Sequence, residues 1–235
     1  MGANLPHYQS LTGSRMQRKP PAKWNKLVAL VLFDFDGVLA DTLDDMLSFA
    51  QDACAELGIH RIATPADLAS LETMSFVEYG RQLGIPSHLL DKFVDGCFKR
   101  FGQRSRPPKI FEGMKQVVEK LSKNNMLAVV TGNTTQTVEN FLEAHGLCGF
   151  VRAIFAVDQP GSKPEKILSA HRQLAKHDDA TYLVGDAASD IRAAREASVK
   201  SIAVSWGHQS LSKLMDAKPD YLIHSPQELL ELLDK

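Results

Sequence analysis

The sequence predicts an α/β fold with a parallel sheet covered on both faces by helices, and an all-helical domain inserted after the first strand. That strand is expected over residues 26–34, a short and continuously apolar run that ends in acid. Residues 43–107 show only helical periodicity, whereas strands and helices alternate from residue 108 onward, as in βαβ units. We therefore expect an N-terminal extension (1–25), an α/β core (26–42 and 108–235) and a helical cap domain (43–107).

The inserted segment is expected to contain four helical stretches. Apolar residues recur every three or four positions from Leu43 until Gly58 ends the pattern. Thr64-Pro65 predicts the start of the second helix, because proline favours the first helical turn. The other two stretches cover residues 76–83 and 87–101. Pro107-Pro108 ends the segment, since paired prolines do not continue a helix.

The alternation after the prolines predicts five more strands, each short and apolar enough to be buried in a parallel sheet. The strands are expected over residues 126–131, 151–157, 180–186, 200–205 and 221–224. The helices between and after them are expected over residues 113–123, 135–145, 164–176, 188–197 and 226–233.

Composition excludes several classes of function. With 27 Lys and Arg against 28 Asp and Glu the formal net charge is −1, so nothing draws the whole chain to nucleic acid or to a membrane surface. Apolar runs fall short of the roughly 20 residues that a bilayer span needs. The three cysteines lie far apart, which favours a reducing compartment. We expect a cytoplasmic protein without nucleic-acid or membrane partners; its oligomeric state stays open.

The N-terminal extension leaves an alternative location open. It contains basic residues but no acidic residue before Asp34, and this is the composition of an organelle transit peptide. A flexible extension without a targeting role is the interpretation that we favour.

Acidic residues follow two of the predicted strands. Asp34 and Asp36 come at the end of the first strand, and Asp186 and Asp190 at the end of the strand over residues 180–186. Ligands of open α/β sheets bind beyond the carboxyl ends of the strands. An isolated aspartate there is usually a turn or capping residue, but carboxylates gathered at one edge repel each other unless a cation lies between them. Oxygen ligands of this kind suit Mg²⁺.

Two further groups of polar residues belong to the same edge. Thr131-Gly132-Asn133 follows the second strand, and Lys163-Pro164 opens the helix after the third. Backbone amides at a helix start and a lysine ammonium both suit a phosphate group. Matching chemistry at several strand ends favours a functional site over chance.

Taken in order, these residues resemble the four motifs of the haloacid dehalogenase-like hydrolases. The motifs are Asp34-Phe35-Asp36-Gly37-Val38-Leu39-Ala40-Asp41-Thr42, Thr131-Gly132-Asn133, Lys163-Pro164, and Gly185-Asp186 with Asp190. The resemblance runs from about residue 27 to residue 233, and a helical insertion directly after the first motif is similar to the C1-cap subclass. It implies a Rossmann-like core, bound Mg²⁺ and a small phosphorylated metabolite as substrate.

The resemblance also implies roles for single residues. Asp34 would be the nucleophile that becomes phosphorylated, and Asp36 the general acid and base. Mg²⁺ would be held by Asp34, by the backbone carbonyl of Asp36 and by Asp186, with Asp190 close by or linked through water. The phosphate group would be bound by Thr131, Gly132, Asn133 and Lys163.

Within the family, the residues favour a phosphatase. Asp36 stands where dehalogenases and phosphonate-cleaving members carry no carboxylate. Sugar-phosphate mutases usually have a cap histidine where this chain has Met46, and a basic residue in the cap loop over residues 73–76, where this chain has none. The pattern looks most like phosphoglycolate phosphatases; a mutase and a catalytically silent phosphate-binding member stay as alternatives.

The residues that select the substrate are expected in the cap. The cationic candidates are Arg81, Lys99, Arg100 and Arg104, and each is as well explained as a solvated surface residue. His208, after Trp206-Gly207, is expected to be a surface loop residue.

Overall fold

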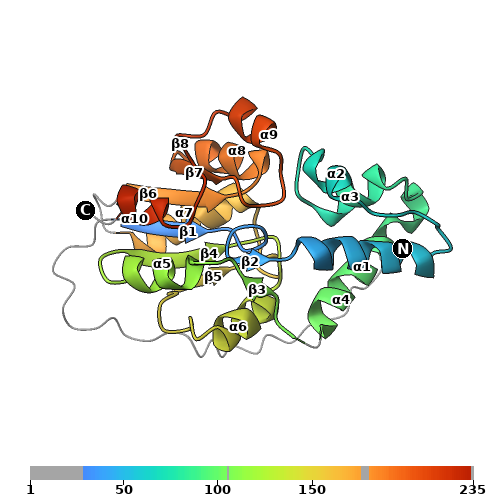
Figure 1. The fold of residues 1–235 in the computed structure, drawn as a ribbon, viewed down its shortest axis with the longest axis horizontal. Helices are drawn as coiled ribbons and strands as arrows, with labels where there is room; N and C mark the ends of the chain where they lie inside the picture. The colour runs from blue at the N-terminus through green and yellow to red at the C-terminus, as the bar shows by residue number, and fades with distance from the viewer. Residues whose placement is uncertain (1–28, 105, 176–179, 234–235) are drawn as a thin grey trace, which may run out of the picture.

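The structure is a computed structural model that describes residues 29–104, 106–175 and 180–233 (Figure 1). The extension over residues 1–25 lies outside the described residues. Six parallel strands form one sheet in the order β5-β4-β1-β6-β7-β8, which confirms the predicted fold class. Their bounds are β1 Ala29–Phe33, β4 Met126–Val130, β5 Ile154–Phe155, β6 Ala180–Gly185, β7 Lys200–Val204 and β8 Tyr221–Ile223.

Strand β1 lies between β4 and β6, and all of its residues are buried. Its last residue, Phe33, pairs with Val129 of β4 and with Val184 of β6. The three strands therefore end at the same edge of the sheet. Because parallel strands run in one direction, the residues that follow them meet at that edge.

Side chains of β1 alternate between two apolar layers, as the pleat of a strand requires. Val31 and Phe33 pack in one cluster with helices α5 (Met114–Leu121), α6 (Thr135–Ala144) and α10 (Glu228–Leu233). Leu30 and Leu32 pack in another with helices α7 (Lys163–Leu174) and α8 (Ala188–Glu196). Helices thus cover both faces of the sheet, as the apolar strands predicted.

The inserted helices form a separate body beside the sheet (Figure 1). They are α1 Leu43–Glu56, α2 Pro65–Ala69, α3 Phe76–Gln82, the 3₁₀ turn η1 Ser87–Leu89 and α4 Leu90–Gln103. Their apolar faces pack on one another around Leu68, Tyr79 and Phe93, in a cluster distinct from those of the sheet. The all-helical insertion is confirmed, and we propose that its boundaries lie at residues 42/43 and 107/108.

The two chain segments that join this cap to the core run side by side. Strand β2 (Ala40–Asp41) pairs antiparallel with β3 (Lys109–Ile110), outside the main sheet. We did not predict this pair, because two residues are too few to show a periodic pattern. Helix α9 (Leu211–Asp216) was missed for the same reason, and β5 is shorter than the predicted 151–157 strand. Among the described residues, no helix has the length and apolar character needed to cross a membrane.

Replacing Phe141 with Ala tests the packing under the site. This side chain of α6 is fully buried and meets the Phe35 ring edge-on at a centroid distance of 5.0 Å. We expect Phe141→Ala to lower the free energy of unfolding by about 3–5 kcal/mol, because it leaves a cavity in the core. Met215→Ala is the control, since Met215 is 58% exposed on α9 and its loss should change stability by less than about 0.5 kcal/mol. Urea unfolding followed by circular dichroism measures both; equal stability of the two variants would contradict this packing.

Candidate active site

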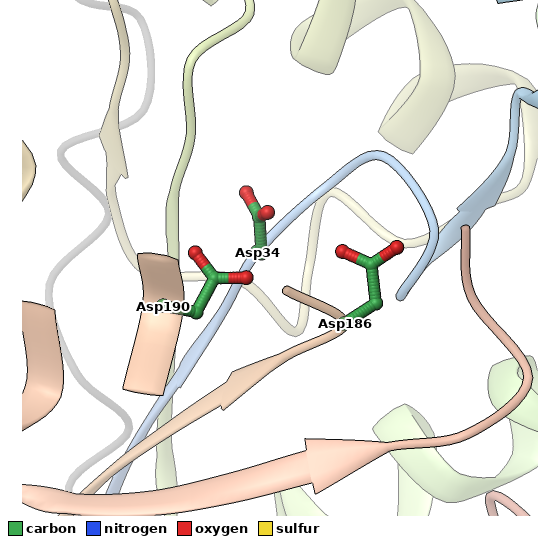
Figure 2. Close-up of side chains that lie close together, drawn as sticks. All are labelled: Asp34, Asp186 and Asp190. Carbon is green, nitrogen blue, oxygen red and sulfur yellow. The ribbon is translucent and has the colours of Figure 1, made fainter. Parts of the chain in front are cut away.

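Three aspartate side chains meet at the carboxyl edge of the sheet (Figure 2). Asp34 follows β1, Asp186 follows β6, and Asp190 lies in the first turn of α8. One carboxylate oxygen from each lies within 4.8 Å of those of the other two. The parallel register brings the first two together, and the helix after β6 adds the third.

Lys163 supplies the positive charge that faces this cluster. It is the first residue of α7, and its Nζ lies 3.1 Å from Asp34 Oδ2 and 2.5 Å from Asp190 Oδ1. Burial alone would lower the pKa of Lys163, but the two carboxylates outweigh burial and raise it above its ordinary value. Lys163 is therefore a charged partner in an ion-pair network rather than a solvated lysine.

One ammonium group does not compensate three carboxylates. Burial, reinforced by the charge of Asp190, raises the pKa of Asp186 to about 7. Burial also raises the pKa of Asp34 well above its ordinary value, although Lys163 opposes that shift. Both shifts mean that the ionised cluster needs more positive charge. Its oxygen donors fit a hard divalent cation, with Asp34, Asp186 and Asp190 as the side chains that would hold it.

Asp36 lies beside this group and not in it. Its Oδ2 accepts a hydrogen bond of 3.2 Å from Asn133 Nδ2, and its Oδ1 is buried without a partner among the described residues. Asp34, Asp36 and Asn133 line the same cavity. A carboxylate with a free buried oxygen near Asp34 is placed to exchange a proton with a bound ligand.

The residues after β4 are arranged partly as expected. Thr131, Gly132 and Asn133 all line the cavity. The backbone N–H of Asn133, expected to face a phosphate, instead donates to Thr131 Oγ1 at 2.9 Å. Since a hydroxyl can accept one hydrogen bond while it donates another, the Thr131 O–H stays available to a ligand.

Two glycines let the backbone approach Asp186. A Cβ atom at Gly37 would lie 2.0 Å from Asp186 Oδ2, and one at Gly207 would lie 2.2 Å from Asp186 Cβ. Gly37 also has a φ of 75°, which side chains disfavour. The absence of a side chain at Gly37 and Gly207 therefore leaves the space that Asp186 occupies.

His208 is buried beside the cluster, so the prediction of a surface residue was wrong. Its side chain is 2% exposed, and its backbone N–H donates to Asp186 Oδ2 at 2.7 Å. Burial lowers the pKa of His208, which favours the neutral imidazole. The signal was present in the sequence: residues that follow β7 emerge at the same edge as those that follow β1 and β6.

Gln209 was also missed, and it connects the site to the cap. Its Oε1 accepts from the N–H of Ala188 at 2.5 Å, and its Nε2 donates to the carbonyl of Leu71 in the cap at 2.7 Å. The start of α8, which carries Asp190, is thereby joined to the loop before α3. No local pattern marks such a bridge, because its two ends are far apart in the sequence.

The cationic candidates in the cap do not reach the cavity. Its lining includes none of Arg81, Lys99, Arg100 and Arg104. Arg100 pairs with Glu56 at 2.5 Å. Arg104 pairs with Asp45 at 2.8 Å, and its guanidinium lies 4.6 Å from the centroid of the Phe101 ring. These arginines stabilise contacts between α1 and the end of α4.

The sequence profile of the haloacid dehalogenase-like hydrolases matches residues 31–204, a span that contains all four motifs. The chain belongs to this family. A phosphoglycolate phosphatase from Synechococcus elongatus is 29% identical over 209 residues, which cover 86% of this chain and 95% of the relative. An N-acetylmuramic acid 6-phosphate phosphatase from Pseudomonas aeruginosa is 26% identical over 216 residues, which cover 87% of this chain and 94% of the relative.

Solved structures of haloacid dehalogenase-like proteins share the fold. A predicted phosphatase from Clostridium acetobutylicum superposes with a TM-score of 0.77 at 22% identity and covers 89% of this chain and all of the other. A haloacid dehalogenase-like family protein from Streptococcus pneumoniae gives a TM-score of 0.76 at 19% identity, with 87% of this chain and 98% of that one covered.

Replacing Gly207 with Ala tests how tightly Asp186 is held. The new methyl group would overlap Asp186 Cβ and displace the carboxylate. Because displaced supporting groups typically cost 10- to 100-fold in metal affinity, we expect a divalent cation, titrated here as Mg²⁺, to bind about 10- to 100-fold more weakly. The matched control is Gly149→Ala, since a Cβ at Gly149 meets nothing within 4 Å. Isothermal titration calorimetry measures both affinities; equal values for the two variants would contradict a role of Gly207 in placing Asp186.

The raised pKa of Asp186 predicts how stability depends on pH without divalent ions. The pKa is about 7 in the folded protein against an ordinary value of 3.8, so between these values only the folded state keeps the proton. The free energy of unfolding should then fall as pH rises through that range. The fall can reach about 4 kcal/mol at about 1.4 kcal/mol per unit.

Urea unfolding in EDTA at about pH 5 and about pH 8 measures the part of this fall that lies between these pH values, about 3 kcal/mol, and Asp186→Asn should reduce it. Stability that is higher at the upper pH in the unaltered protein, or a fall that Asp186→Asn leaves unchanged, would contradict the prediction.

Proposed function

We propose that the protein is a Mg²⁺-dependent phosphatase that hydrolyses a small phosphate monoester through a phosphorylated Asp34. One observation carries the proposal: Asp34 lies at the floor of a cavity between Lys163 and two further carboxylates, and Asp36 lines the same cavity. A nucleophile, a general acid and a source of positive charge are thus present together. The phosphatases among its curated relatives support the class of reaction.

The proposed metal ligands are Asp34, Asp186, Asp190 and the backbone carbonyl of Asp36. Bound Mg²⁺ would offset the repulsion between the phosphate group and the Asp34 carboxylate. Lys163 contributes to the same end, because its ammonium already contacts Asp34. Thr131, Gly132 and Lys163 are the proposed phosphate-binding groups, with Asn133 orienting Asp36 through its side-chain amide.

In the first step, an Asp34 carboxylate oxygen attacks phosphorus and the bond from phosphorus to the ester oxygen breaks. Asp36, protonated at that stage, gives its proton to the departing alcohol oxygen. In the second step, water attacks the phosphorus of the aspartyl-phosphate and gives a proton to Asp36, while the bond from phosphorus to the Asp34 carboxylate oxygen breaks. Inorganic phosphate leaves, and both carboxyl groups return to their starting states.

The alternatives receive less support. Met46 and the uncharged residues Thr73, Met74 and Ser75 line the cavity on the cap side. A mutase would be expected to carry a histidine and a basic residue at these places. A catalytically silent member would be expected to lack one of the four motifs, and here all are present.

The division of labour between Asp34 and Asp36 is the sharpest test of this mechanism. Asp34→Asn should abolish turnover and leave no phosphate on the protein. Asp36→Asn should slow hydrolysis of an alkyl phosphate by about a hundred- to ten-thousand-fold. With p-nitrophenyl phosphate, whose leaving group hardly needs a proton, the first step should survive better. The Asp36→Asn protein should then accumulate a hydroxylamine-labile phosphate on the peptide that contains Asp34, detected by mass spectrometry.

Asp44→Asn is the control, because Asp44 is an exposed residue of α1 close in sequence to the first motif. The Asp44→Asn variant should retain full activity. In a separate test of the metal requirement, the unaltered protein should lose activity in EDTA and regain it with Mg²⁺. Normal turnover by Asp34→Asn, or a covalent phosphate on another residue, would contradict the mechanism. Activity that persists in EDTA would contradict the metal requirement.

A further inference from the structure

The cavity above Asp34 is much larger than a phosphate group requires. Its volume is about 700 Å³, and it extends from the carboxylates of the core to helices α1, α3 and α4 of the cap. Cavities of about 300–1,000 Å³ are typical of sites that enclose drug-sized ligands. A two-carbon ester such as phosphoglycolate would leave most of this space without contacts.

The cap side of the cavity is an apolar wall, formed by Met46, Met74, Phe76, Val94, Phe98 and Phe101. Its aromatic rings are packed on one another: the Phe76 ring meets the Phe98 ring edge-on at a centroid distance of 5.1 Å, and it lies tilted against the Phe101 ring at 5.5 Å. The polar residues beside them, Thr73 and Ser75, are uncharged. An apolar group of the substrate would find many contacts on this wall, whereas a carboxylate would lose its hydration there.

Positive charge reaches the cavity only from the core, within the described residues. The residues concerned are Lys163, Lys166 and Arg192. Lys163 is held by Asp34 and Asp190. Arg192 donates to the backbone carbonyl of Glu72 at 2.5 Å, and its Nη1 lies 4.0 Å from the Glu72 carboxylate. Lys166 is buried, with 8% of its surface exposed. Because all three belong to the core, a second anionic group pointing at the cap wall would meet no counter-charge from the cap residues that line the cavity.

We infer that the preferred substrate is a phosphate monoester whose alcohol group is uncharged and largely apolar, about the size of an aromatic ring or larger. The phosphate binds over Asp34 and the alcohol group lies against the apolar wall. Esters that carry a carboxylate beside the phosphate are disfavoured. This inference rests on the proposed function. Overall similarity does not select the ester, because relatives at 29% and 26% identity are named for phosphoglycolate and for an amino-sugar phosphate.

The test compares benzyl phosphate, ethyl phosphate and 2-phosphoglycolate with the full-length enzyme and Mg²⁺. All three are esters of alkanol oxygens, so differences in kcat/KM report binding of the alcohol group more than the ease of its departure. We expect kcat/KM for benzyl phosphate to exceed that for ethyl phosphate by at least about tenfold, which is the effect of one or more apolar groups in a matching pocket. The kcat/KM for phosphoglycolate should be lower than that for ethyl phosphate.

A matched pair of variants tests whether the missing counter-charge on the cap side disfavours a carboxylate in the substrate. Val77 lines the cavity and is 38% exposed, whereas Ile62 is 72% exposed on the cap and lies outside the cavity. Val77→Lys should raise the ratio of kcat/KM for phosphoglycolate over benzyl phosphate severalfold, because it adds the missing counter-charge. Ile62→Lys should leave that ratio unchanged.

Phe98→Ala should lower kcat/KM for benzyl phosphate and leave kcat/KM for ethyl phosphate unchanged. Thermal unfolding checks that the variant is folded.

The outcomes separate this inference from the proposed function. Hydrolysis of all three esters with phosphoglycolate preferred would overturn the inference and leave the phosphatase intact. So would a Phe98→Ala effect that is equal for benzyl and ethyl phosphate, or equal ratios for Val77→Lys and Ile62→Lys. Failure to hydrolyse any ester with Mg²⁺ would overturn the proposed function instead.

Discussion

The repulsion between buried carboxylates at one sheet edge is the constraint on which the rest of the structure depends. The parallel register delivers Asp34 and Asp186 to the same place, and α8 adds Asp190. Burial makes their ionised forms costly, as the raised pKa values of Asp34 and Asp186 show. Lys163 offsets part of this cost and leaves the remainder to a divalent cation. Buried carboxylates that repel one another cost stability, and groups with such perturbed pKa values are typical of functional sites.

The surrounding backbone is shaped to hold these carboxylates. Gly37 and Gly207 leave room for Asp186, and the N–H of His208 donates to it. Gln209 then joins the first turn of α8 to the cap at Leu71. Lys213 of α9 adds hydrogen bonds to the carbonyls of Ser70 and Leu71. These polar contacts between core and cap centre on Ser70 and Leu71, and the apolar wall of the cap lines the same cavity as Asp34.

Most of the fold could be predicted because its signals are local. The strands are short and continuously apolar, and the helices between them carry caps that occur in the sequence, such as Thr64 before Pro65 and Ser162 before Lys163. What was missed is either too short to show a period, as with the β2–β3 pair and α9, or depends on position in the sheet. Strand β5 is an edge strand with one neighbour, so fewer of its residues form ladder hydrogen bonds than its apolar sequence suggested.

The sequence by itself determined which residues gather at the candidate site, since a parallel sheet brings the ends of its strands together whatever their distance along the chain. Asp34, Asp36, Thr131, Lys163 and Asp186 could be named for that reason. Only the tertiary structure decided what faces them. His208 is buried because β7 ends beside β6. Arg100 and Arg104 pair with acids of α1 and do not line the cavity. The packing of α1, α3 and α4 sets the shape and polarity of the apolar wall, and such contacts between distant residues leave no mark on any single stretch of sequence.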